Sequence, residues 1–173
     1  IDTNGIHWGE VIAEQYRLAG MEIERRLYRD AYVHGERSLA KAPIIAPEDT
    51  FHTLLRKKIA IQFEYLREQT QSGRFTPEAA EQVADGCYNK VKSTLATSRA
   101  VLERLPGQFP MGVVTNFYGN MPVVLDEFGL AGYFKEIVES SVVGIRKPDP
   151  ELFALGVKAL GMNAEEIAVV GDS

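Results

Sequence analysis

The chain has 173 residues, of which 45% are hydrophobic and 25% are charged, so it resembles an ordinary globular protein with room for one core and a small additional lobe. Its net charge of −5 argues against a nucleic-acid-binding protein, because such proteins usually carry a basic patch. The single Cys87 cannot form an internal disulfide, which favours a cytoplasmic location, and no apolar run approaches the roughly 18 residues that cross a bilayer.

The first half of the sequence, over residues 8–92, has the pattern of helices only. Apolar residues keep helical spacing through 51–66, and Pro47 suits the first turn of that helix. A second long helix is predicted to begin at Thr76-Pro77, with Val83, Cys87 and Val91 on one stripe. A turn at 71–73 separates the two helices. We therefore predict a helical lobe in this half.

Beyond residue 93, short apolar runs alternate with amphipathic segments. Strands are predicted at 111–114, 137–138 and 167–170, and helices over 95–105, 121–128 and 150–160. Asp149 can cap the last of these helices, and Gly161 can end it. This alternation predicts an α/β fold with a parallel sheet and helices on both faces. Ligands of such sheets bind beyond the carboxyl ends of the strands.

Several chemically capable residues fall at the predicted strand ends or in nearby loops. They are Asp2 and Asn4 near the start, Thr115 and Asn116 after 111–114, Lys147 in a loop, and Asp172 after 167–170. A carboxylate can attack phosphorus and form an acyl-phosphate, which divides one difficult displacement into two easier steps. Two carboxylates and a phosphate repel one another, so a hard cation such as Mg²⁺ is expected between them. A hydroxyl, backbone N–H groups at a helix N-terminus and a lysine suit the phosphoryl oxygens.

Four ordered motifs in this sequence resemble those of the haloacid dehalogenase superfamily. They are Asp2-x-Asn4-Gly5, Val113-Val114-Thr115-Asn116, Gly144 through Lys147-Pro148-Asp149-Pro150, and Val170-Gly171-Asp172-Ser173. The resemblance covers essentially the whole chain and is strongest over 111–173. It implies a Rossmann-like core over 1–12 and 93–173, with an inserted α-helical cap over 13–92.

The resemblance also implies roles for individual residues. Asp2 would be the nucleophile, Thr115 with Asn116 the phosphate anchor, and Lys147 the residue that offsets the negative charge. Asp172 would bind Mg²⁺ together with Asp2 and the backbone carbonyl of Asn4. The implied activity is hydrolysis of a small phosphorylated metabolite through an aspartyl-phosphate, with neither nucleic acid nor membrane as a partner.

The sequence departs from the family's phosphatases at Asn4, where they carry a second aspartate that acts as general acid and base. An amide cannot transfer this proton, and loss of such a group typically slows a reaction by roughly 10²–10⁴-fold. Three interpretations stay open: a slow phosphatase, another hydrolase such as a metal-independent carbon–halogen hydrolase, or a phosphate-binding homologue without turnover. An engineered replacement of aspartate would also account for Asn4.

The motifs also lie close to both ends of the sequence. In the family a core strand precedes the first motif, and another acid follows the fourth motif by several residues. Here Ile1 precedes Asp2 and Ser173 follows Asp172. We therefore expect the core to be truncated at both ends and the native protein to be longer.

Overall fold

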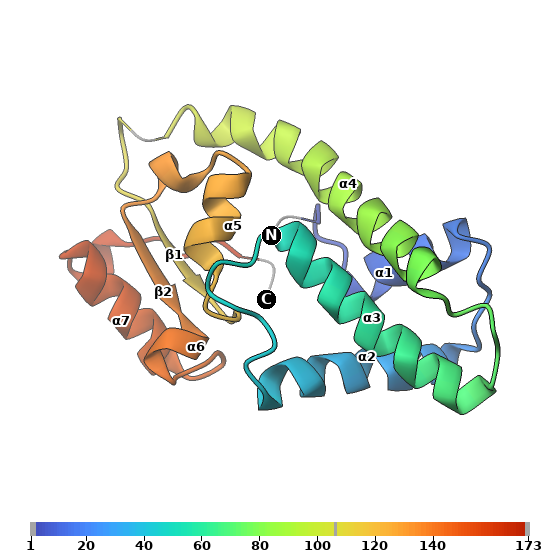
Figure 1. Ribbon diagram of the computed structural model, residues 1–173. Helices are drawn as coiled ribbons and strands as arrows, with labels where there is room; N and C mark the ends of the chain where they lie inside the picture. Colours follow the sequence, from blue (N-terminus) through green and yellow to red (C-terminus); the bar gives the residue numbers. More distant parts are fainter. Residues whose placement is uncertain (1–2, 106, 172–173) are drawn as a thin grey trace. The chain divides into compact units, whose positions relative to one another are not determined.

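The computed structural model describes residues 3–105 and 107–171, which form two compact units (Figure 1). Unit 1 contains the described residues of Ile1–Ile45 and Asp49–Leu95, and unit 2 contains those of Ala46–Glu48 and Ala96–Ser173. None of the described helices combines the length and apolar character that crossing a membrane requires.

Unit 1 is helical throughout its regular structure, as the sequence predicts. Its helices are α1 (Trp8–Leu18), α2 (Arg25–Lys41), α3 (Phe51–Thr70) and most of α4 (Pro77–Leu102). The expectation that α3 starts near Pro47 is wrong, because the Thr50 side chain accepts a hydrogen bond from the Thr53 N–H and so caps the helix three residues later.

Helix α4 is a single helix where the sequence analysis predicts two. No proline or glycine occurs between Gly86 and Pro106, so nothing in the local sequence interrupts the backbone hydrogen bonds of the helix. The division between the units falls between Leu95 and Ala96, inside this helix. The boundary is therefore a change in tertiary contacts and has no signal in local backbone structure.

The interior of unit 1 combines aliphatic and aromatic packing with a few buried polar groups. Tyr16 and Phe63 have ring centroids 5.2 Å apart, and Phe63 meets Phe75 edge to face at 5.5 Å. The Tyr16 hydroxyl donates to Oε1 of the fully buried Gln62 at 3.2 Å, and the buried Lys58 forms an ion pair with Glu36. Buried polar groups such as these need partners, because an unpaired one costs free energy.

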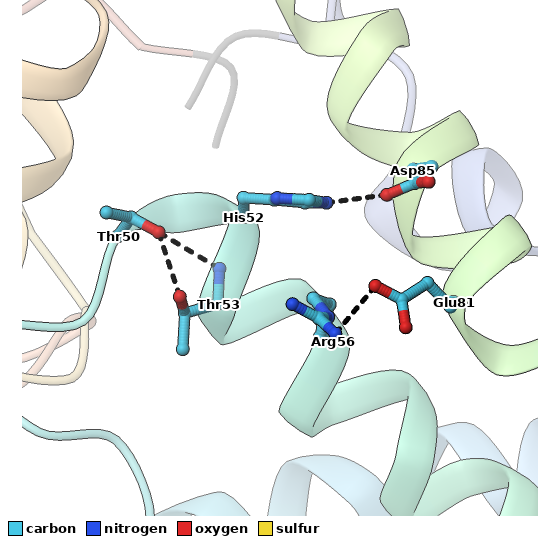
Figure 2. Close-up of polar contacts among 6 residues, drawn as sticks. All are labelled: Thr50, His52, Thr53, Arg56, Glu81 and Asp85. Atoms are coloured by element: carbon cyan, nitrogen blue, oxygen red, sulfur yellow. Dashed lines mark hydrogen bonds and ion pairs between the residues drawn. The ribbon is translucent and has the colours of Figure 1, made fainter. Parts of the chain in front are cut away.

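Polar side chains also join α3 to α4 at the edge of this interior (Figure 2). His52 Nε2 lies 2.6 Å from Asp85 Oδ1, and one turn later the Arg56 guanidinium lies 2.6 Å from Glu81. All four side chains are at least one-third exposed, so each pair is expected to contribute only about 0–1 kcal/mol. Burial of apolar side chains therefore dominates the packing of these two helices.

Unit 2 contains a parallel pair of strands, β1 (Gly112–Thr115) and β2 (Glu136–Glu139), which confirms the first two strand predictions. Between them lie α5 (Met121–Glu127) and η1 (Ala131–Tyr133), and after them α6 (Ser140–Val143), α7 (Pro150–Leu160) and η2 (Ala164–Glu166). Helix α7 packs on both strands and α5 packs on β2, with the two helices on opposite sides of the strands in Figure 1.

Helix α7 begins and ends where the sequence predicts. The Asp149 side chain accepts from the Glu151 N–H at 2.9 Å, and Gly161 takes a left-handed conformation with φ of 66° at the other end. Leu152 is fully buried. At Gly156 the helix approaches β1 so closely that an added Cβ would lie 2.5 Å from Val114 Cγ2.

The prediction of a strand at 167–170 is wrong for the described structure. This segment follows η2 as irregular chain, and the side chains of Val169 and Val170 are 69% and 96% exposed. A strand requires a hydrogen-bonding neighbour, and within residues 3–105 and 107–171 the strands β1 and β2 pair only with each other. An apolar β-branched run alone does not supply that neighbour.

We predict that Gly156→Ala destabilises the protein by about 1–3 kcal/mol, because the new methyl group overlaps a branched side chain held in a strand. Urea unfolding followed by circular dichroism would measure the change in the free energy of unfolding. Gly132→Ala is the matched control, since a Cβ there meets no atom within 4 Å. Equal stability of the two variants would contradict the close packing of α7 on β1.

Candidate active site

The candidate site lies at the carboxyl ends of the two parallel strands. Thr115 is the last residue of β1, and its partner in the register is Glu139, the last residue of β2. Thr115 is half-buried, whereas Glu139 is 3% exposed. The strands thus place a hydroxyl and a buried carboxylate on neighbouring positions at one edge of the sheet.

A pair of hydrogen bonds joins this edge to the loop that contains Lys147. Asn116 Oδ1 accepts from the Lys147 backbone N–H at 2.8 Å, and Asn116 Nδ2 donates to the Lys147 carbonyl at 3.1 Å. One side-chain amide therefore satisfies both backbone groups of a residue 31 positions away. The loop with Lys147 is consequently fixed beside the residue that follows Thr115.

The Lys147 side chain itself is not used by these contacts. The residue is half-buried, and the ion pairs formed among residues 3–105 and 107–171 do not include its ammonium group. A lysine in a loop that is fixed beside the end of β1 suits an anionic ligand.

The segment after Asn116 is hydrogen-bonded to the last residue of β2. Glu139 accepts hydrogen bonds from the backbone N–H of Gly119 at 2.5 Å and from that of Met121 at 3.3 Å. Met121 is the first residue of α5, so a protein carboxylate already occupies the first N–H group of this helix.

The first motif forms a tight turn over residues 3–6. Asn4 and Gly5 have φ of 58° and 74°, and the Thr3 hydroxyl donates to the Ile6 carbonyl at 2.6 Å. Positive φ at both central residues is the pattern of a type I′ turn, for which Asn-Gly is the preferred pair. Asn4 is exposed. The amide at position 4 is therefore compatible with the backbone that it occupies.

The two carboxylates expected to bind a metal, Asp2 and Asp172, lie outside the described residues. Among residues 3–105 and 107–171 there is no group of three His, Cys, Asp or Glu side chains that could hold a metal ion. The predicted oxygen donors, two carboxylates and the carbonyl of Asn4, are of the kind that Mg²⁺ prefers.

The Asn116 side-chain amide is bound to the backbone of Lys147. The expected role of Asn116, with Thr115, as a phosphate anchor stays a prediction. Sequence analysis missed Glu139. The rule that ligands gather after strand ends could have found this residue, because Glu139 directly follows the predicted strand at 137–138.

Comparisons with known proteins bear on the family of this chain. A family model described as haloacid dehalogenase-like hydrolase matches residues 5–173. The chain is 49% identical over 45 residues to a phosphoserine phosphatase of Thermus thermophilus, a match that covers 26% of this chain and 18% of that protein. It is 35% identical over 89 residues to a phosphoglycolate phosphatase of Yersinia pseudotuberculosis, covering 50% and 35% of the two chains.

A third relative is a haloacid dehalogenase-like hydrolase domain-containing protein 3 of Danio rerio, 36% identical over 61 residues, or 35% of this chain and 25% of that protein. The matched segments thus span about a third or less of the length of these relatives.

We predict that Asn116→Asp destabilises unit 2 by about 1–3 kcal/mol, because the carboxylate cannot donate to the Lys147 carbonyl and leaves it unpaired. Urea unfolding would measure the loss. Asn89→Asp serves as the control, since Asn89 is exposed on α4 and the change of charge is the same. If both variants lose the same stability, the two hydrogen bonds to Lys147 do not stabilise the loop.

Proposed function

The chain belongs to the haloacid dehalogenase-like hydrolase family, and from this premise we propose that it hydrolyses a phosphate ester of a small metabolite. The observation that carries the proposal is the pair of hydrogen bonds between the Asn116 side chain and the Lys147 backbone, which fixes the loop with Lys147 beside the end of the strand that contains Thr115. Two relatives with phosphatase names support the same substrate chemistry.

We assign the covalent step to Asp2. An oxygen of its carboxylate attacks phosphorus, the bond from phosphorus to the ester oxygen breaks, and the leaving alkoxide takes a proton to become an alcohol. Water then attacks the aspartyl-phosphate, which releases inorganic phosphate and restores the carboxylate. Dividing the displacement into two steps is the usual advantage of covalent catalysis.

The other residues would bind and orient the phosphoryl group. The Thr115 hydroxyl and the Asn116 backbone N–H would donate to its oxygens, and the Lys147 ammonium would offset charge that builds up in the transition state. Asp2, the Asn4 carbonyl and Asp172 would hold Mg²⁺, which supplies a positive charge between carboxylates and phosphate. Asn116 would act on Lys147 through its side chain and on substrate through its backbone.

Asn4 determines how fast this reaction would run. Protonation of the leaving oxygen would fall to water, because an amide has no proton to transfer at neutral pH. Since a positioned acid contributes roughly 10²–10⁴-fold, we expect slow turnover. The helical segment over 13–92 would serve as the cap that excludes water and selects substrate.

The direct test is hydrolysis of p-nitrophenyl phosphate with Mg²⁺ and with EDTA. We expect slow phosphate release that needs the metal and falls to background in Asp2→Ala, because both the nucleophile and a metal ligand are lost. Asp30→Ala, on the exposed surface of α2, is the control for loss of a carboxylate. Phosphate binding without any turnover would instead indicate a non-catalytic homologue, and metal-independent release of halide from a haloacid would indicate a dehalogenase.

We further predict that Asn4→Asp raises kcat for this substrate by about 10²–10⁴-fold, because it restores a carboxyl group that can donate a proton. The left-handed turn accepts the change, since aspartate also tolerates positive φ. Thermal unfolding would check that the fold is kept. An unchanged kcat in a folded variant would show that position 4 does not limit the reaction.

A further inference from the structure

Glu139 is a buried acid that the mechanism above does not use. It ends β2 opposite Thr115, and 3% of it is exposed. Its two carboxylate oxygens accept from different backbone donors, Oε1 from Gly119 and Oε2 from Met121. Burying a carboxylate costs free energy unless the carboxylate is hydrogen-bonded. The two contacts therefore favour one position of the backbone at Gly119 and Met121, which carries the donors.

The contacts of Glu139 cross from one strand end to the loop after the other. Gly119, with φ of 99°, lies in the segment 116–120 between β1 and α5. The next residue after Glu139 adds a third hydrogen bond to this segment, because the Ser140 hydroxyl donates to the Phe117 carbonyl at 3.4 Å. The segment 117–121 is therefore attached at three points of its backbone to Glu139 and Ser140.

The same loop is attached at its other side through Asn116, whose side chain holds Lys147. Thr115 and Asn116 thus lie between two sets of backbone hydrogen bonds. Glu139 also occupies the N–H groups of Gly119 and Met121.

We propose that Glu139 is a positioning residue for the phosphate site. It fixes the 116–120 loop so that the Thr115 hydroxyl and the Asn116 N–H keep the orientation that a phosphoryl group requires. This inference rests on the proposed function. A positioning role differs from a purely structural one, because the contacts of the Glu139 carboxylate then affect the affinity for phosphate as well as the stability of the fold.

The test compares the wild-type protein with Glu139→Gln and Glu139→Ala. The glutamine variant keeps the shape but replaces one acceptor oxygen with an NH₂ group that faces a backbone N–H. Glu136→Gln is the matched control, because Glu136 lies on the same strand and is exposed. The measurements are KM and kcat for p-nitrophenyl phosphate, Kd for inorganic phosphate, thermal unfolding, and hydrogen exchange at the amides of Gly119 and Met121.

In Glu139→Gln we expect faster exchange at both amides and a roughly 10- to 100-fold rise in KM and in the Kd of phosphate, with kcat changed less than about threefold. Glu139→Ala should show the larger rise, and Glu136→Gln should match the wild type. If alanine prevents folding, the glutamine variant still gives the comparison.

Two results overturn the positioning role while the proposed function stands: an active wild type whose folded Glu139→Gln variant keeps its KM and Kd, or unchanged exchange at Gly119 and Met121. Faster exchange and lower stability with unchanged KM and Kd would show that Glu139 is merely structural. A wild type that neither hydrolyses the ester nor binds phosphate overturns the proposed function, and the role of Glu139 with it.

Discussion

Unit 2 depends on side chains that hydrogen-bond to distant backbone. The amide of Asn116 pairs with the N–H and the carbonyl of Lys147, much as a neighbouring strand would. A two-stranded sheet with four residues in each strand is marginal by itself, so it needs such ties and the packing of α7 on both strands. At Gly156 this packing leaves no space for a side chain.

The use of backbone partners has a consequence for chemistry. Asn116 and Glu139 order the loops at the strand ends by binding main-chain groups. In the proposed function, the Thr115 hydroxyl and the Lys147 ammonium would meet the phosphate without breaking these contacts. Preorganisation of this kind is what makes donors effective toward a developing negative charge.

Unit 1 is ordered by a different balance of forces. Its helices bury apolar side chains such as Ile12, Ile59 and Val83. The buried Lys58 and the Oε1 atom of Gln62 have partners on neighbouring helices. The pairs that join α3 and α4 are exposed and add little. Contacts rather than local sequence divide this unit from unit 2, since α4 continues without interruption across the boundary.

Local sequence determined those features whose physics is local. The spacing of apolar residues predicted helix α3, and short apolar runs predicted strands β1 and β2. Asp149 and Gly161 predicted the two ends of helix α7. The family motifs likewise predicted the family, which the comparison over residues 5–173 shows. These signals depend on neighbours a few positions apart.

Tertiary structure decided everything that requires a partner far along the chain. The run at 167–170 has the composition of a strand but no hydrogen-bonding neighbour in the described structure, so it stays irregular and exposed. Asn116 and Glu139 have the same side chains in any fold, yet their partners lie 31 and about 20 residues away and come close only when the strands pair. Their roles follow from that pairing, because a hydrogen bond depends on distance in space and not on order in the sequence.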